Sequence, residues 1–201
     1  LGAVIIGVLI MLLVLWKLNQ KKQTDLINRA QMDSMTNILN KSSIQYQIND
    51  WLQHGEKEGI QALLMLDLDQ FKNINDTYGH ALGDEVIKAA AKVLKDTFRS
   101  SDIVGRAGGD EFMVLMKNVR WDKVIERQLQ ELCRKFENLK IGSIPCGAIH
   151  CSIGAAYYPE HGRNFDELYH YADEALYEAK RQGRNTYVIY HQEKKPESLK
   201  K

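Results

Sequence analysis

The sequence predicts an α+β sandwich, in which helices pack on a mostly antiparallel β-sheet. Residues 61–68 form one continuous apolar run, which is typical of a central strand buried on both faces. Residues 106–112 place two glycines between apolar runs, a pattern that favours a β-hairpin. Apolar residues at helical spacing predict three helices, at 86–98, 121–139 and 165–181.

At the N-terminus, residues 1–16 contain no charged or polar side chain. This run is slightly shorter than the ~20 residues needed to span a bilayer, but the sequence begins inside it. Because lysines follow directly after Trp16, we expect the end of a transmembrane helix in the inner membrane, with the rest of the chain in the cytoplasm. A buried core helix and the core of a signal peptide are the alternatives.

Residues 17–32 are polar and favour a helix, so we expect a helical linker that could pair with a second copy of the chain. From residue 33 the composition becomes that of a globular domain, which we place at 33–190, followed by a polar tail at 191–201. The remaining predicted elements are a helix at 44–52 and strands at 112–116, 151–158 and 187–190.

Local signals refine two of the helices. For the segment 165–181, Asn164 is a suitable N-cap and Gly183 a suitable stop signal. The segment 121–139 has a predicted buried stripe, which consists of Trp121, Ile125, Leu129, Leu132 and Phe136.

Composition narrows the class of protein. The chain has 201 residues, of which 44% are hydrophobic, enough for one well-buried domain. Its 27 basic and 26 acidic residues nearly balance, so we expect no nucleic-acid partner. Three cysteines lack metal-binding spacing and cannot all pair with one another. We expect reduced, buried thiols in a cytosolic domain at Cys133, Cys146 and Cys151.

The stretch Arg-Ala-Gly-Gly-Asp-Glu-Phe at residues 106–112 is the centre of the site prediction. Gly108 and Gly109 would permit a tight turn with positive φ. Asp110 and Glu111 then stand at a hairpin tip. Because neighbouring side chains of a strand point to opposite faces, the two acids should have different roles. Taken alone, the tip could equally be a solvated turn.

A second pair of carboxylates, Asp67 and Asp69, stands where the buried strand at 61–68 ends. Two residues apart, they should share one face of the strand. They could be strand-end caps or salt-bridge partners, but a neighbouring hairpin would let Asp67 meet Asp110. Carboxylate oxygens with substrate phosphates opposite them are typical of Mg²⁺ sites.

The segment that follows indicates a nucleotide. Backbone amides at a helix start, together with Lys72, suit a triphosphate. Asn75 and Asp84 suit guanine, because an amide can serve O6 or N3 and a carboxylate can accept from N1–H and the N2 amine. Separately, they could be a turn residue and a first-turn helix acid. Lys180 and Arg184, at a predicted helix C-terminus, could hold terminal phosphates or complement the helix dipole.

Six segments occur in a characteristic order. They are Asp-Leu-Asp-Gln-Phe-Lys-Asn-Ile-Asn-Asp-Thr-Tyr-Gly-His-Ala-Leu-Gly-Asp at 67–84, Gly-Gly-Asp-Glu-Phe at 108–112, Cys-Ser-Ile-Gly-Ala-Ala at 151–156, Tyr-Pro at 158–159, Ala-Asp-Glu-Ala-Leu-Tyr-Glu-Ala-Lys at 172–180 and Gly-Arg-Asn at 183–185. Together they resemble the GGDEF family, the bacterial diguanylate cyclases, over about residues 33–190.

The resemblance implies a palm-like fold, similar to that of adenylyl cyclases and polymerases, and an enzyme that condenses two GTP into cyclic di-GMP and two pyrophosphates. It implies two Mg²⁺ or Mn²⁺ ions per active site, with Asp67 and Asp110 as metal carboxylates and the carbonyl of Leu68 as a further ligand. Glu111 would lie beside the metals or the attacking 3′-hydroxyl. Each domain binds one GTP, so a homodimer is also implied.

The same resemblance implies the substrate contacts. Asn75 and Asp84 would bind guanine, and Lys72, Lys180 and Arg184 would bind phosphates. The full set of implied substrate-binding residues is Phe71, Lys72, Asn75, Asp84, Gly108, Gly109, Lys180 and Arg184.

Arg99 and Asp102 match by position the family's Arg-x-x-Asp inhibitory site, where the product binds and arrests the enzyme. Arginine presents a fork to phosphate or to a guanine edge, and aspartate can accept from guanine. A surface ion pair is the alternative.

Three positions depart from the family pattern. Asn37 and Lys41 replace Gly and Arg in the opening motif, and Ala107 replaces a larger residue. Asparagine tolerates a left-handed backbone, so the turn should survive, whereas lysine lacks the bidentate contacts of arginine. The alternatives to an active cyclase are a catalytically silent receptor for GTP or cyclic di-GMP, and a related cyclase for ATP. Asp84 argues against ATP, because a carboxylate repels adenine N1.

Overall fold

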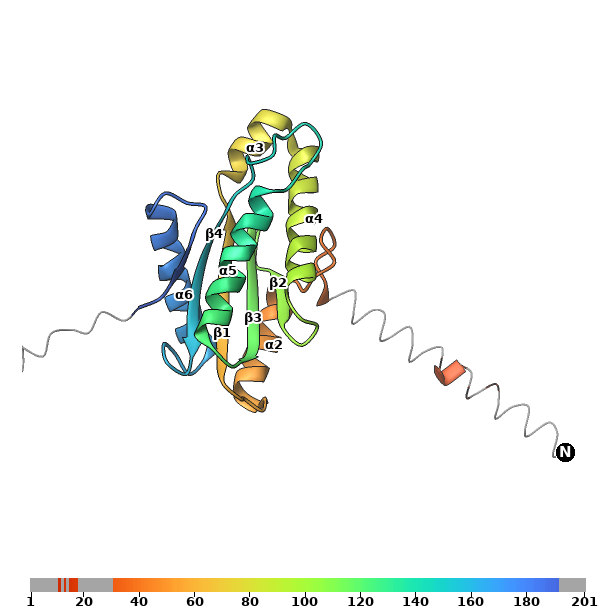
Figure 1. The fold of residues 1–201 in the computed structure, drawn as a ribbon. Helices are drawn as coiled ribbons and strands as arrows, with labels where there is room; N and C mark the ends of the chain where they lie inside the picture. The colour runs from red at the N-terminus through yellow and green to blue at the C-terminus, as the bar shows by residue number, and fades with distance from the viewer. Residues whose placement is uncertain (1–10, 12, 14, 18–30, 192–201) are drawn as a thin grey trace, which may run out of the picture.

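The structure is a computed structural model that describes residues 11, 13, 15–17 and 31–191 (Figure 1). The domain elements are α2 (Lys41–His54), β1 (Ile60–Leu68), α3 (Phe71–Tyr78), α4 (His80–Thr97), β2 (Ile103–Arg106), β3 (Glu111–Val119), α5 (Asp122–Glu137), β4 (Cys151–Tyr158), α6 (Phe165–Arg181) and β5 (Tyr187–Ile189). The strands form one sheet in the order β2-β3-β1-β4-β5, in which only the β4–β5 pair is parallel. The predicted α+β sandwich is confirmed.

Strand β1 lies at the centre of the sheet and separates two cores. Leu64 and Leu66 lie in the core that includes α4 and α5, whereas Leu63 and Met65 lie in the core that includes α2 and α6. All four side chains are at most 2% exposed. Because both faces of the strand are covered, its sequence is continuously apolar rather than alternating. Figure 1 shows α5 in front of this sheet.

Helix α6 packs directly on β4 and is thereby fixed over the end of β1. A Cβ atom at Gly154 would come within 2.1 Å of the carbonyl oxygen of Ala172, so only glycine permits this approach. The predicted N-cap is confirmed, since Asn164 Oδ1 accepts from the amide of Glu167 at 2.9 Å. The helix ends just before Gly183, whose φ of +112° suits a C-terminal stop.

Two sequence-based expectations are wrong. Trp121 is not part of the buried stripe of α5, because the helix starts at Asp122 and the extended residue before it leaves the indole 68% exposed. Cys146 is exposed and Cys133 half-buried, so only Cys151 is the buried thiol that was expected; all three are free. By contrast, the left-handed backbone predicted for Asn37 is confirmed, with φ of 53°.

The predicted membrane and linker segments, residues 1–16 and 17–32, lie almost wholly outside the described residues, as does the tail after His191. Within the part of the chain that the structure describes, no helix has both the length and the apolar character needed to cross a bilayer. Membrane attachment and the helical linker therefore stay predictions.

Candidate active site

The glycine hairpin lies against the end of β1. Asp67 of β1 and Glu111 of β3 are direct partners across the two antiparallel strands, so their side chains project from the same face of the sheet. The amide of Leu68 donates to the carbonyl oxygen of Asp110 at 3.2 Å. The strand that ends in Asp67 thus lies beside the hairpin as predicted, but the cross-strand partner of Asp67 is Glu111, and Asp110 stands in the turn just before β3.

The two hairpin glycines do not have the predicted backbone conformation, because neither has a positive φ. The turn closes through hydrogen bonds between Gly108 and Glu111, 3.3 Å in each direction. A Cβ atom at Gly108 would lie 3.2 Å from a carboxylate oxygen of Glu111, and one at Gly109 would meet nothing within 4 Å. Gly108 therefore leaves room for the Glu111 carboxylate, and Gly109 keeps the tip open.

Arg106, which the sequence analysis did not single out, fixes this tip. Its Nε and Nη2 donate to the carbonyl oxygen of Gly109 at 3.0 and 2.7 Å, and its Nη1 lies 3.2 Å from Oδ1 of Asp33. Burial alone would raise the pKa of Asp33, but hydrogen bonds from Thr36 and the charge of Arg106 outweigh it and hold that pKa below its ordinary value. The available sequence signals were the arginine beside the glycines and an aspartate, Asp33, at the start of the opening motif that contains Asn37 and Lys41.

Lys180 forms an ion pair with Asp67, with 2.8 Å between Nζ and Oδ2. Burial raises the pKa of Asp67; the ammonium of Lys180 lowers it, and the carboxylates of Asp110 and Glu111 raise it, so that the net change is upward. The cluster thus concentrates negative charge in a half-buried place, and an added cation would relieve this repulsion.

These residues fit a hard divalent cation. Asp67, Asp110 and Glu111 lie at one end of β1, where the two hairpin carboxylates act on the charge of Asp67, and oxygen ligands are those that Mg²⁺ prefers. Among the described residues, no three His, Cys, Asp or Glu side chains already surround a common point. Substrate phosphates would have to complete the coordination, which is usual for Mg²⁺.

The start of α3 is open to an anion. Its N-cap residue, Gln70, is left-handed (φ 53°) and makes no capping bond with its side chain, which leaves first-turn amides for a ligand. Exposed Lys72 lies in this first turn. Asp69 turns inward instead, where it accepts from Oγ of Ser152 at 2.7 Å and from the amide of Asn185 at 2.9 Å. Asp69 is therefore a strand-end cap.

The two predicted guanine residues lie on neighbouring helices. Asn75 of α3 packs closely on Gly83 of α4. A Cβ atom at Gly83 would lie 1.8 Å from Oδ1 of Asn75 and 3.4 Å from the ring of Phe71. Asp84, the next residue, is exposed. Helix α4 begins at His80 and has no acidic residue in its first turn, so Asp84 is not a first-turn acid. Phe71, Asn75 and Asp84 thus gather where α3 meets α4.

Arg184 lines a cavity of about 500 Å³ together with α3 residues such as Thr77 and with Asp69, which follows the end of β1. Gln70 belongs to this cavity and to the start of α3, so Arg184 borders the candidate phosphate position.

Arg99 and Asp102 form a turn before β2 and line a second cavity, of about 420 Å³. The two carboxylate oxygens of Asp102 accept from the amides of Arg99 at 2.9 Å and Lys117 at 3.0 Å. Backbone amides therefore hold the turn together, and the side chain of Arg99 borders the cavity. Met32, at the beginning of the domain, borders it too.

Similarity to known proteins identifies the family of this chain. The profile described as "Diguanylate cyclase, GGDEF domain" matches residues 30–186, well over half of the chain. The chain belongs to the GGDEF family. The "Probable diguanylate cyclase DgcT" of Escherichia coli (strain K12) is 36% identical over 166 residues, which are 81% of this chain and 36% of that protein. "Diguanylate cyclase DgcM" of the same strain is 36% identical over 186 residues, 90% of this chain and 44% of that protein. The GGDEF chain thus spans less than half the length of these relatives.

Solved GGDEF structures confirm the fold. The GGDEF domain of DgcB from Caulobacter crescentus in complex with c-di-GMP has a TM-score of 0.70 at 30% identity, and covers 81% of this chain and 97% of that one. A DgcB structure that adds the coiled coil has a TM-score of 0.76 at 27% identity, covering 88% and 94%.

Proposed function

We propose that this GGDEF chain is a diguanylate cyclase, which condenses two GTP into cyclic di-GMP and two pyrophosphates with one GTP held by each of two facing domains. One observation carries the proposal. Asp67 is the cross-strand partner of Glu111, while Asp110 is hydrogen-bonded to the backbone of Leu68. The chain therefore retains all three acids at one strand end, which a silent receptor would have no need to keep.

Helices α3 and α4 bind the substrate. Asp84 accepts from guanine N1–H and the N2 amine, and Asn75 contacts another edge of the base. The phosphates lie at the uncapped start of α3, near Lys72. Lys180, now 2.8 Å from Asp67, is placed to exchange that carboxylate for a phosphate oxygen.

The reaction is an in-line displacement. The 3′-oxygen of one GTP forms a bond to the α-phosphorus of the other, the bond to the bridging oxygen breaks, and pyrophosphate leaves. Asp67 and Asp110 would hold the divalent cations, which when bound would supply a lowered pKa of the 3′-hydroxyl and neutralisation of the leaving pyrophosphate. Glu111 would accept the proton of the 3′-hydroxyl.

The enzyme is inhibited by its product and attached to the membrane. Product bound at Arg99 and Asp102 arrests the enzyme, and the cavity of about 420 Å³ beside them supports this role. Residues 1–16 anchor the chain in the inner membrane with its domain in the cytoplasm, and residues 17–32 join two chains as a homodimer.

The test is to incubate the purified chain at high concentration with GTP and Mg²⁺ and to detect cyclic di-GMP by mass spectrometry. Product from the native sequence and none from Asp110→Ala would support the proposal. Equal product from both would contradict the role of Asp110. Bound GTP without product from either, even after a fused coiled coil forces dimerisation, would indicate a receptor.

A further inference from the structure

A cavity of about 300 Å³ lies at the end of the sheet opposite to the catalytic acids. Because β1 runs antiparallel to both β3 and β4, its first residue, Ile60, lies beside the last residues of those strands. Ile60 lines the cavity and stands seven positions before Asp67, which is roughly 23 Å along an extended strand. The proposed function makes no use of this cavity.

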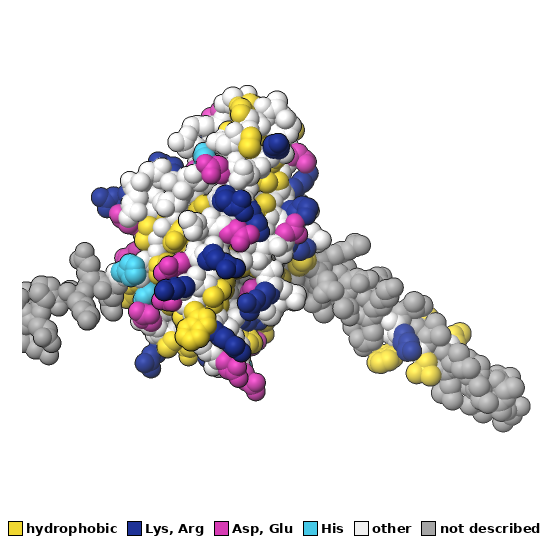
Figure 2. Space-filling model, viewed as in Figure 1, with side chains coloured by type: hydrophobic (Ala, Val, Ile, Leu, Met, Phe, Trp, Pro, Cys, Tyr) yellow, Lys and Arg dark blue, Asp and Glu magenta, His cyan; other side chains and the backbone are white. Residues whose placement is uncertain are grey.

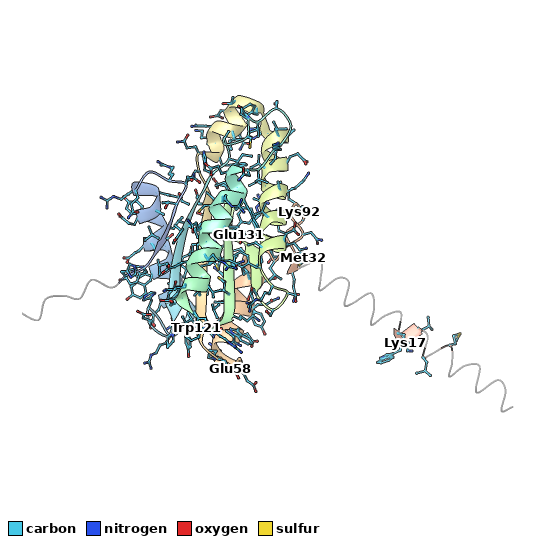
Figure 3. The ribbon with its side chains drawn as sticks, in the orientation of Figure 1. Lys17, Met32, Glu58, Lys92, Trp121 and Glu131 are labelled. Atoms are coloured by element: carbon cyan, nitrogen blue, oxygen red, sulfur yellow. The ribbon has the colours of Figure 1, made fainter. Side chains whose placement is uncertain are left out.

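The rim of the cavity carries a large exposed aromatic side chain. Trp121, 68% exposed, stands where β3 leads into α5. Figure 3 shows it at the lower end of the sheet. Figure 2, in the same orientation, shows acidic (magenta), basic (dark blue) and histidine (cyan) side chains mixed around hydrophobic (yellow) ones on this lower part of the surface. An aromatic anchor beside charged groups is typical of recognition sites.

The wall of the cavity contains an unsatisfied polar group. Tyr157 is only 6% exposed, and its buried hydroxyl has no hydrogen-bond partner. Its neighbour His161 is already engaged, because Nδ1 accepts from the amide of Tyr157 at 2.9 Å and the two rings stack at 5.3 Å between centroids. Buried hydroxyls normally have a partner, so this one indicates a ligand that supplies it.

The charge around this hydroxyl is negative. Asp122, Glu126 and Glu160 line the cavity, whereas Arg120 is the lining residue of opposite permanent charge. Burial raises the pKa of Tyr157, and the same three carboxylates raise it further. Burial also lowers the pKa of His161, so this imidazole adds little positive charge at neutral pH. A cation is therefore the ligand that the cavity favours.

We propose that this cavity binds the guanidinium of an arginine presented by a basic peptide segment of a partner protein. The guanidinium donates to the hydroxyl of Tyr157 and to the carboxylate of Glu126, and the indole of Trp121 covers its face. Arginine suits the cavity better than lysine, because its planar group both forks to two acceptors and stacks on an aromatic ring.

The test is a titration of the ¹⁵N-labelled full chain, followed by NMR, with a blocked Gly-Arg-Gly peptide. We expect shifts centred on the indole N–H of Trp121 and on the amides of Glu126 and His161, with the amide of Asp67 unmoved. A Gly-Lys-Gly peptide should bind more weakly, and Gly-Glu-Gly should not bind. Added salt should weaken the complex, because the carboxylates are near the surface.

Two variants separate recognition from folding. Glu126→Gln should weaken binding about tenfold, the effect expected for one lost hydrogen bond between charged groups, whereas Glu137→Gln, an exposed carboxylate at the other end of α5, should leave it unchanged. Tyr157→Phe should also weaken binding but leave the thermal midpoint unchanged or higher, because the hydroxyl has no partner to lose.

Three results would overturn the inference. The arginine peptide could leave the cavity resonances unmoved, or bind equally well to Glu126→Gln and Tyr157→Phe. The acidic peptide could bind in its place, which would make Arg120 the recognising group and an anion the ligand.

Discussion

Replacement of Arg106 by alanine would free the hairpin tip from the beginning of the domain. The change removes the hydrogen bonds of 3.0 and 2.7 Å to the carbonyl of Gly109 and the 3.2 Å ion pair with Asp33. Arg106 and Asp33 have side chains only 15% and 22% exposed, so water screens their interaction little. A hydrogen bond to a charged group contributes about 1.5–3 kcal/mol. Nε and Nη2 of Arg106 share one acceptor, the carbonyl oxygen of Gly109, so we count them as one hydrogen bond and add the ion pair with Asp33. On this basis we expect Arg106→Ala to lower the free energy of unfolding by about 3 kcal/mol.

The same change should damage catalysis more than substrate binding. Without Arg106 the tip that carries Asp110 and Glu111 loses its restraint, and a misplacement of ~1 Å can cost roughly a hundredfold in rate. Binding of GTP should stay near that of the native chain, since α3 and α4 are untouched. Arg106→Lys, which keeps the charge but not the fork, should be intermediate.

Urea unfolding and the rate of cyclic di-GMP formation measure the two effects. The matched control is Arg134→Ala, which removes an exposed arginine from α5 and should change neither quantity. An unchanged urea midpoint and an unchanged rate in Arg106→Ala would refute the reasoning.

The remaining predictions concern the base, the opening motif and the ion pair. Gly83→Ala should raise the KM for GTP about tenfold with little change in unfolding, because its Cβ would displace the Asn75 side chain; equal KM values would contradict the placement. Asp33 has a lowered pKa in the folded chain, so the stability that it contributes is present above its unfolded pKa of about 3.9 and is lost as pH falls through the folded value. The thermal midpoint of the native chain should therefore fall as the pH is lowered from 6 to 3, and that of Asp33→Asn should fall less. Lys180→Met should raise the pKa of Asp67 further, so that Mn²⁺ binding requires a higher pH; an unshifted pH profile would disprove this.

The fold and the acid cluster could be predicted because their signals are local. The apolar run at 61–68 can be buried only between two layers, and a carboxylate at its end, such as Asp67, must reach solvent, a cation or a hydrogen-bonding partner. Asn164 and Gly183 mark the ends of α6 through short-range backbone chemistry.

The contacts that could not be predicted join distant parts of the chain. The partners Arg106 and Asp33 are 73 residues apart, and no spacing pattern connects them. The spacing of Asp67 and Asp69 predicted a shared face of the strand, but it could not show that groups 83 and 116 residues away bind the oxygens of Asp69. Trp121 fitted the helical stripe, but a stripe does not show where the helix begins.

The central claim is that Asp67 and Asp110 together hold the catalytic cations. Titration of Mn²⁺ followed by electron paramagnetic resonance, in the presence of a non-hydrolysable GTP analogue, tests it directly. For the native sequence we predict about two tightly bound Mn²⁺ ions per chain. For Asp110→Asn we predict loss of tight Mn²⁺ binding while the analogue still binds. The same number of ions with the same affinity in both proteins would contradict the claim.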